Sequence, residues 1–434
     1  MSLEQKIRST LKDAGARINT GNPVALRPDA APSQRSRLRT RPMLAFVAAF
    51  VGVLVLGVVG LLVSGEPGSD TDLVPLDQAG LETLEWTTVD ALPTDYSVDA
   101  ITQGPNGWLA LAGRFINSTG GDYLILRSED GVEWTRMDAS FPAAVHVDEI
   151  IGTDTGYVAY GLYAGEDFSV TTTDRPSNFP EPGVWASSDG ADWQLTPLPL
   201  PPPEEAISEI VSYRAFNLVV DDNVTIALGV EFDEDLPDVE GTVTVPTRSL
   251  MWIFEEPGEW QLIQADNVDE LVDLTVGPAG IVATRATDTG ISVRVLDQQG
   301  VWEQLATVPG ERFQANIVGK GDGYLIQTST GLYFSPNAVE WTPVEGPSVA
   351  AVLAGHPGGF TVVSRSGGAE TVWWSPDGHT WTVVGTPEDL PVDLEFVSGA
   401  AATANSIAMY GQTQGPSLDI TGVEGFLVIG TSSR

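Results

Sequence analysis

The alternation of apolar and polar residues divides the chain into regions with different expected structures. In residues 2–18, apolar side chains recur at helical spacing among basic ones, which predicts an amphipathic helix. From Met43 to Val63 the chain has 21 residues without a charge, which as a helix span about 31 Å and can cross a bilayer. After residue 80, short β-rich runs alternate with glycine-containing turns, which predicts an all-β domain over 81–434.

The charges on either side of the apolar run predict its orientation. Four arginines precede it and three acids follow it: Arg35, Arg37, Arg39 and Arg41, then Glu66, Asp70 and Asp72. By the positive-inside rule, residues 1–42 are a cytoplasmic basic tail, with 19–42 disordered, and the C-terminal part is extracytoplasmic. A cleaved signal peptide is the alternative, but the long leader and the absence of an A-x-A site favour a single-pass anchor over 43–63 in the cell membrane, followed by a linker over 64–80.

Internal repetition is the strongest pattern in the β-rich region. A tryptophan closes a recurrent segment seven times, at Trp86, Trp134, Trp193, Trp260, Trp302, Trp341 and Trp381. Each full copy contains four β-rich runs, which is the content of a propeller blade. The first copy supplies only a fourth strand and the last supplies three, so the two ends are expected to complete one blade and close the ring. The fold predicted is a seven-bladed β-propeller; a six-bladed ring with one decayed copy is the alternative.

The turn before the tryptophan strand carries a recurrent motif. Three copies share serine, aspartate, glycine and tryptophan at fixed spacing: Ser128, Asp130, Gly131 and Trp134; Ser187, Asp189, Gly190 and Trp193; Ser375, Asp377, Gly378 and Trp381. Serine and aspartate can bond backbone amides within a turn, and glycine accepts positive φ. The motif resembles the Asp-box, or bacterial neuraminidase repeat, of sialidase-type propellers, although it is one residue shorter. In that family the box lies far from the active site, so the resemblance implies a fold and carries over no catalytic residue.

Charge and composition restrict the function further. The formal charge of −38 combines a net +6 in residues 1–42 with −44 beyond the apolar run. Such an acidic domain excludes nucleic acid as a partner, and it suits either simple solubility or a basic or cationic partner. The absence of cysteine excludes disulfides and thiolate metal sites. The three histidines, His146, His356 and His379, have no ligand spacing and are expected on loops or the surface.

The stretched copies are the best candidates for function. Insertions at 165–183 and 231–249, with the connection 196–206, are expected on the face opposite the motif turns. The candidate binding residues of this face are Asp167, Arg175, Asp233, Glu234, Asp235, Asp238 and Glu240. These acids could hold a calcium ion, although they lack EF-hand spacing; no other cofactor or metal is expected.

The sequence therefore predicts a binding protein without catalytic activity. Arg114, Arg285 and Arg365 all end second strands and could share one face, but no nucleophile motif, metal triad or phosphate loop accompanies them. We expect a membrane-tethered extracytoplasmic binding or sensor propeller that recognises an envelope protein or glycan. An envelope assembly or structural factor is the alternative, and a sialidase-like glycoside hydrolase is a third.

Overall fold

The structure is a computed structural model that describes most of the β-rich region. It describes residues 84–93, 95–117, 120–164, 180–202, 211–221, 224–233, 246–255, 258–263, 271–297, 301–310, 315–320, 322–347, 350–356, 359–366, 369–391, 396–403, 406–412 and 425–432. The predicted tail, membrane helix and linker lie outside these residues and stay predictions. Within the described ranges, no helix is long and apolar enough to span a membrane.

The described residues form seven antiparallel sheets of four strands each, all within the unit Thr71–Arg434. Blades 1 to 3 are β2 (Ser97–Gly104), β3 (Gly107–Asn117), β4 (Gly120–Ser128) and β5 (Thr135–Met137); β6 (Ala144–Thr153), β7 (Gly156–Tyr163), β8 (Glu181–Ser187) and β9 (Gln194–Pro197); β10 (Val211–Asp221), β11 (Val224–Asp233), β12 (Pro246–Glu255) and β13 (Gln261–Ile263).

Blades 4 to 7 repeat this order. They are β14 (Leu271–Gly277), β15 (Gly280–Thr287), β16 (Gly290–Leu296) and β17 (Trp302–Val308); β18 (Ala315–Lys320), β19 (Gly323–Thr328), β20 (Gly331–Ser335) and β21 (Thr342–Pro343); β22 (Ala350–His356), β23 (Gly359–Ser366), β24 (Ala369–Ser375) and β25 (Thr382–Gly385); β26 (Phe396–Ala402), β27 (Ser406–Gln412), β28 (Gly425–Ser432) and β1 (Leu84–Thr88).

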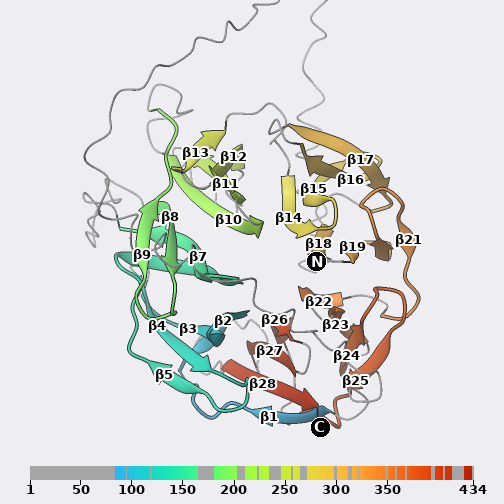
Figure 1. The fold of residues 1–434 in the computed structure, drawn as a ribbon, viewed down its shortest axis with the longest axis horizontal. Helices are drawn as coiled ribbons and strands as arrows, with labels where there is room; N and C mark the ends of the chain where they lie inside the picture. Colours follow the sequence, from blue (N-terminus) through green and yellow to red (C-terminus); the bar gives the residue numbers. More distant parts are fainter. Residues whose placement is uncertain are drawn as a thin grey trace, which may run out of the picture. The chain divides into compact units, whose positions relative to one another are not determined.

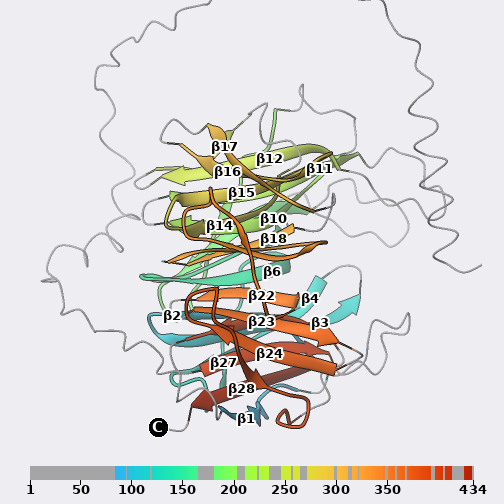
Figure 2. The ribbon, with the colours of Figure 1, turned by 90° about the vertical axis from the view of Figure 1, so that its right-hand side faces the viewer.

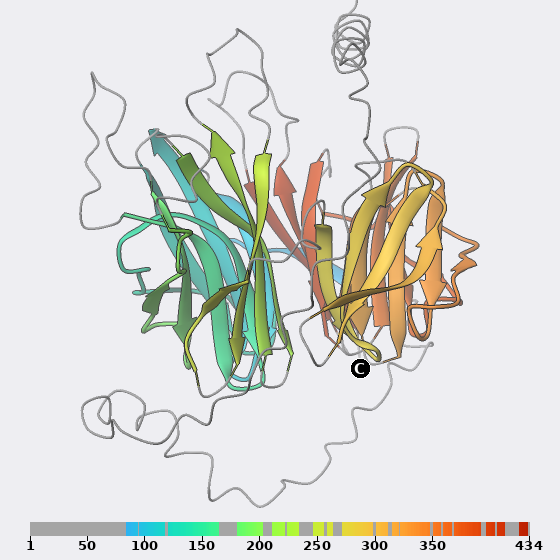
Figure 3. The ribbon, with the colours of Figure 1, turned by 90° about the horizontal axis from the view of Figure 1, so that it is seen from above.

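The seven blades surround one axis, with the first strand of each blade innermost (Figure 1). Neighbouring blades contact one another in sequence order, and β26 of blade 7 contacts β2 of blade 1. The view from the side shows the blades stacked face to face, and the view from above shows their strands running between the two faces of the ring (Figures 2 and 3). The prediction of a seven-bladed propeller is confirmed, and the six-bladed alternative is wrong.

Apolar side chains are buried between blades. Seven hydrophobic clusters of buried residues each draw on two adjacent blades, so every interface of the ring has its own core. The largest fully buried side chains include Trp108, Trp185, Trp252 and Trp374, which lie on second or third strands. Period-2 alternation sends successive side chains of a strand to opposite faces, and both faces are covered, so the middle strands read as nearly continuous apolar runs.

The two ends of the described chain complete blade 7, as predicted. Strand β1 pairs antiparallel with β28, and Trp86 lies opposite Gly430. The indole Nε1 of Trp86 donates a hydrogen bond to the carbonyl oxygen of Val384 in blade 6, 3.3 Å away. A side chain at Gly430 would collide with this indole ring. One tryptophan therefore joins the N-terminal strand to both the last blade and its neighbour.

We expect Trp86→Ala to lower the free energy of unfolding by about 3 kcal/mol, because it removes a half-buried aromatic contact at the point of ring closure. Urea denaturation followed by fluorescence measures the change. Val132→Ala, at a position 49% exposed on another blade, is the control and should stay within about 0.5 kcal/mol of wild type. A Trp86→Ala variant as stable as this control would contradict the closure seen here.

The structure corrects the limits of the two insertions. The first was predicted over 165–183, but β8 already begins at Glu181. The second was predicted over 231–249, but β11 continues to Asp233 and β12 begins at Pro246. Glu231 is fully buried and pairs with Arg248, which lies directly opposite it, at 3.0 Å. A buried carboxylate needs a charged partner, and Arg248 can provide it only from the neighbouring strand. The two strands therefore stay paired beyond the predicted limits of the insertion.

Candidate functional site

The motif residues build turns at the ends of third strands. Ser128 Oγ accepts a hydrogen bond from the amide of Gly131 at 2.8 Å, and Asp130 Oδ1 accepts one from the amide of Val132, also at 2.8 Å. Trp134 Nε1 donates to the carbonyl oxygen of Gly131 at 2.9 Å. Gly131 has φ +81°, a conformation in which a side chain would be strained.

The other motif copies have the same bonds. They join Ser187, Asp189, Gly190 and Trp193 in blade 2, and Ser375, Asp377, Gly378 and Trp381 in blade 6. Blade 5 has a degenerate copy of the motif, in which Asn337 stands in the aspartate position and Ala338 in the glycine position; Asn337 and Trp341 repeat the aspartate and tryptophan bonds. Backbone donors hold the pKa of Asp130 and of Asp189 below the usual range. All these bonds stay within the turn, so the motif residues act in local structure.

The opposite end of the ring is where inner strands begin and where second strands connect to third strands; we call it the entry face. The antiparallel order of every blade puts these connections on one face and the motif turns on the other. Most of the candidate loop residues, namely Asp167, Arg175, Glu234, Asp235, Asp238 and Glu240, lie outside the described residues. Asp233 is the last residue of β11, at the entry face. Among the described residues, no group of three or more acids or histidines is arranged to hold a metal ion.

Six of the seven inner strands carry a β-bulge near the entry face. The extra residue is Asp99 in β2 and Asp148 in β6, with equivalent bulges in β10, β14, β22 and β26. A bulge re-aims the side chains around it, which is why bulges often occur beside functional sites. The residue after the bulge is Glu149 in β6, Asn217 in β10 and Asp273 in β14. Three consecutive blades thus present polar groups at the same level.

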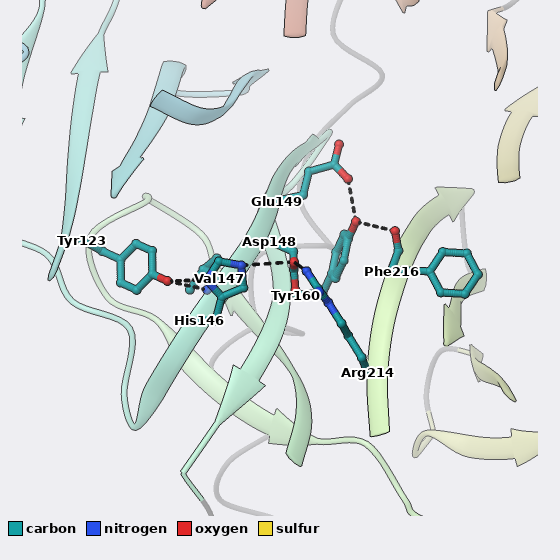
Figure 4. A network of polar contacts seen from close by, with 8 residues as sticks. All are labelled: Tyr123, His146, Val147, Asp148, Glu149, Tyr160, Arg214 and Phe216. Carbon is teal, nitrogen blue, oxygen red and sulfur yellow. Dashed lines mark hydrogen bonds and ion pairs between the residues drawn. The ribbon is translucent and has the colours of Figure 1, made fainter. Parts of the chain in front are cut away.

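A chain of polar contacts crosses blades 1 to 3 at this level (Figure 4). The hydroxyl of Tyr123 lies 2.8 Å from His146 Nδ1, and His146 Nε2 lies 3.2 Å from Asp148 Oδ1. Arg214 of blade 3 pairs with the same carboxylate oxygen of Asp148. We call these residues, with Asp99, Glu149, Tyr160 and Asp273, the axial cluster; Tyr410 belongs to it too, because the charges of Glu149 and Asp99 add to the effect of burial in raising its pKa.

Protein groups engage both ring nitrogens of His146. The Val147 amide donates to the Tyr123 hydroxyl at 3.1 Å, and the same hydroxyl shares a hydrogen bond with His146 Nδ1. His146 Nε2 faces the carboxylate of Asp148. Burial raises the pKa of Asp148, but the His146 bond and the Arg214 charge outweigh it and hold that pKa below its usual value.

Glu149 and Asp273 extend the cluster toward the axis. The Tyr160 hydroxyl lies 3.0 Å from Glu149 Oε2 and also 3.0 Å from the Phe216 carbonyl oxygen (Figure 4). Asp273 accepts hydrogen bonds from the amides of Leu274 (2.9 Å) and Ile317 (2.8 Å), and from the side chain of Asn217. Asp273 therefore links blades 3, 4 and 5 through a single carboxylate.

The carboxylates of the axial cluster are hard to ionise together. Burial, with a smaller contribution from the charge of Glu149, raises the pKa of Asp273 to about 7. Burial likewise raises the pKa of Asp99 to about 6, with Asp148 adding to the shift. Glu149 keeps solvent contact but is enclosed by the surrounding blades, and its pKa is raised as well, by burial and then by Asp148. The cluster is thus an electronegative site that would gain from a neighbouring cation.

The sequence interpretation missed most of this cluster. His146 was expected on a loop or the surface, but it lies in the inner strand β6; His356 was misplaced in the same way and is buried in β22. The usable signal was a Val-Asp pair that recurs at the start of inner strands, in SVDAI, HVDEI and LVDLT. A charged residue that recurs at the same position of otherwise apolar strands indicates that side chains at this position lie outside the hydrophobic core.

The arginines at the ends of second strands do lie at the entry face. Arg114 pairs with Asp95 and with Asp122, and Arg365 pairs with Glu370 at 2.6 Å. Arg285 ends β15 in the same way. The carboxylate partners neutralise Arg114 and Arg365, so these two residues do not form the arginine cluster that a sialidase-like site would require.

No known protein family matches the chain by sequence, and no curated protein does. Solved structures match its fold over most of their length. Virginiamycin B lyase from Staphylococcus aureus has 10% identity and a TM-score of 0.46, with 80% of this chain and 99% of that one covered. A streptogramin B lyase has 11% identity and a TM-score of 0.43, covering 80% and 97%. The six-bladed Aleuria aurantia lectin has 10% identity and a TM-score of 0.36, covering 68% and 97%. At this similarity only the propeller architecture is shared.

Proposed function

We propose that this chain is a membrane-tethered extracytoplasmic binding propeller whose axial cluster recognises a cationic group of an envelope protein. The observation that carries the proposal is the convergence of Asp99, Asp148, Glu149 and Asp273 from three blades at one level of the entry face. Elaborated sites on a rigid scaffold are a common basis of recognition. The predicted binding loops, whose flanking strands end at the same face, would enlarge this surface.

The charge of the cluster supports the choice of a cation. Four carboxylates are opposed by Arg214, whose charge is already shared with Asp148. An ammonium or guanidinium group placed among them would stabilise the ionised forms and lower their raised pKa values. A net negative domain would also accelerate the approach of a basic partner at low salt.

A binding role fits the axial cluster better than catalysis does. A general base needs a nitrogen or oxygen within reach of a substrate proton, but both ring nitrogens of His146 face protein partners. A tyrosinate nucleophile is disfavoured too, because burial raises the pKa of Tyr123 to about 12, with Asp99 and Asp148 adding to the shift. An envelope assembly factor would use the same surface. An amino glycan is the second candidate ligand, since its ammonium group would meet the same carboxylates.

The test is a binding assay with the full-length chain in detergent. The probes are an oligolysine peptide, an oligoglutamate peptide, a glucosamine oligomer and an N-acetylglucosamine oligomer. We expect oligolysine to bind and Glu149→Gln to weaken that binding at least tenfold, because a charge-assisted contact at an enclosed site is lost. Glu129→Gln removes the same charge from a motif turn and should leave binding within twofold. If both variants lost the same amount of binding, overall charge alone would explain the effect, and the site would be refuted.

A further inference from the structure

The acids of the axial cluster affect one another although they belong to different blades. Beyond the effect of burial, which is the largest cause each time, the charge of Asp148 raises the pKa of Asp99 in blade 1 and of Glu149 beside it. The charge of Glu149 in turn adds to the effect of burial on the pKa of Asp273 in blade 4. These mutual effects place the four carboxyl groups within electrostatic range of one another around the axis.

Asp99 and Glu149 have few neighbours that favour their ionised forms. Burial raises the pKa of Asp99 to about 6, although His146 in β6 and the hydroxyl of Ser97 oppose the shift. Burial raises the pKa of Glu149 as well, although the Tyr160 hydroxyl opposes it. Burial also raises the pKa of the tyrosines that face these acids, so that they carry no charge near neutral pH: Tyr123, Tyr160 and Tyr410.

Asp273 holds a proton near neutral pH for the same reason. Burial raises its pKa to about 7, against the hydrogen bonds that two backbone amides and the side chain of Asn217 donate to it. The guanidinium group of Arg214 pairs with Asp148. Between pH 6 and 7 the cluster therefore carries protons on carboxyl groups that a bound cation would favour in the ionised form.

We propose that binding of a cationic ligand at the axial cluster releases protons, so that the propeller holds the ligand at neutral pH and releases it in mild acid. The inference rests on the proposed function and adds to it the condition under which the ligand leaves. An ammonium group favours the ionised carboxylates, and protons compete with it for the same oxygens. A lysine side chain keeps its charge throughout this pH range, so the change in affinity originates in the propeller.

The test is calorimetric titration of the full-length chain in detergent with oligolysine, at constant ionic strength, in two buffers of different ionisation enthalpy. At pH 6.5, Asp273 with a pKa of about 7 and Asp99 with a pKa of about 6 together hold about one proton. We expect binding at this pH to release up to about one proton from these two groups, and the affinity to be at least tenfold weaker at pH 5.5 than at pH 7.5.

Two variants assign the released protons. Asp273→Asn should remove most of the dependence of affinity on pH. Asp99→Asn should reduce the decline in affinity from pH 7.5 to pH 5.5 by about fourfold, and it keeps the test valid if Asp273→Asn folds poorly. The side chain of Asp99 accepts only a long hydrogen bond, 3.5 Å from Ser97 Oγ, so its replacement disturbs little. Asp154→Asn, the same change in the exposed turn after β6, is the matched control and should behave like wild type.

The possible failures distinguish this inference from the proposed function. Oligolysine binding with an affinity independent of pH and a heat independent of the buffer would refute proton release and leave binding intact. The absence of binding at pH 7.5 would refute both. A wild-type pH dependence in both Asp99→Asn and Asp273→Asn would place the titrating groups elsewhere. A change in Asp154→Asn equal to that in Asp99→Asn would assign the effect to overall charge and overturn the proposal.

Discussion

A Gly152→Ala variant is expected to lose at least about 3 kcal/mol of the free energy of unfolding, because the inner strands of blades 1 and 2 touch at this residue. A Cβ atom at Gly152 would lie 1.8 Å from the carbonyl oxygen of Gln103. The collision is with backbone, which cannot rotate away as a side chain can. The Gly152 amide also donates to Thr102 Oγ1 at 2.7 Å, a bond that any shift of β6 would break.

The same contact recurs between blades 4 and 5, where Gly319 approaches Val276 and its amide donates to Thr275 Oγ1 at 2.7 Å. Chemical denaturation of Gly152→Ala measures the cost. Thr155→Ala, in the turn that follows the same strand, is the control and should change stability by less than about 0.5 kcal/mol. Wild-type stability in Gly152→Ala would mean that the inner strands are farther apart than described.

The second large effect is a pH dependence of stability that originates at Asp273. Its pKa is about 7 in the folded protein and near 3.8 when unperturbed. At pH values between these two, the folded protein therefore holds a proton that the unfolded chain has released. This contribution to stability is complete below about pH 4 and is lost as the pH rises through about 7. At about 1.4 kcal/mol per unit, the loss is on the order of 4 kcal/mol.

The measurement is the difference in unfolding free energy between wild type and Asp273→Asn from pH 4 to pH 8. We expect the wild type to lose stability relative to Asp273→Asn as the pH rises. Asp130→Asn is the matched control, since backbone donors lower the pKa of Asp130. Its contribution is lost only as the pH falls below about 4, so the same difference should stay constant from pH 4 to pH 8. A difference that does not change with pH for Asp273→Asn would refute the assignment.

The architecture could be read from the sequence because it depends on local, repeated signals. Trp86 and the six later tryptophans gave the number of blades, and the incomplete first and last copies gave the closure. The insertion limits were less accurate because Glu231 and Arg248 look like loop residues, yet the two pair across β11 and β12, with Glu231 buried and Arg248 partly exposed.

The axial cluster could not be derived in the same way. His146 is 23 residues from Tyr123, and Arg214 is 66 residues from Asp148, so their contacts exist only once three blades are in place. Composition favoured a surface position for a lone histidine, whereas in the bulged strand β6 it faces Tyr123 on β4 and Asp148 on its own strand. The acidic loop residues named from the sequence remain predictions.

Site-specific photo-crosslinking in the native membrane tests the central claim most directly. A photoreactive residue at Ser398, an exposed bulge position in β26 at the entry face, is compared with one at Val132 on the motif-turn face. The account predicts a discrete adduct from Ser398 that disappears in the Glu149→Gln background, and none from Val132. An adduct from Val132 alone, or one from Ser398 that Glu149→Gln leaves unchanged, would contradict recognition by the axial cluster.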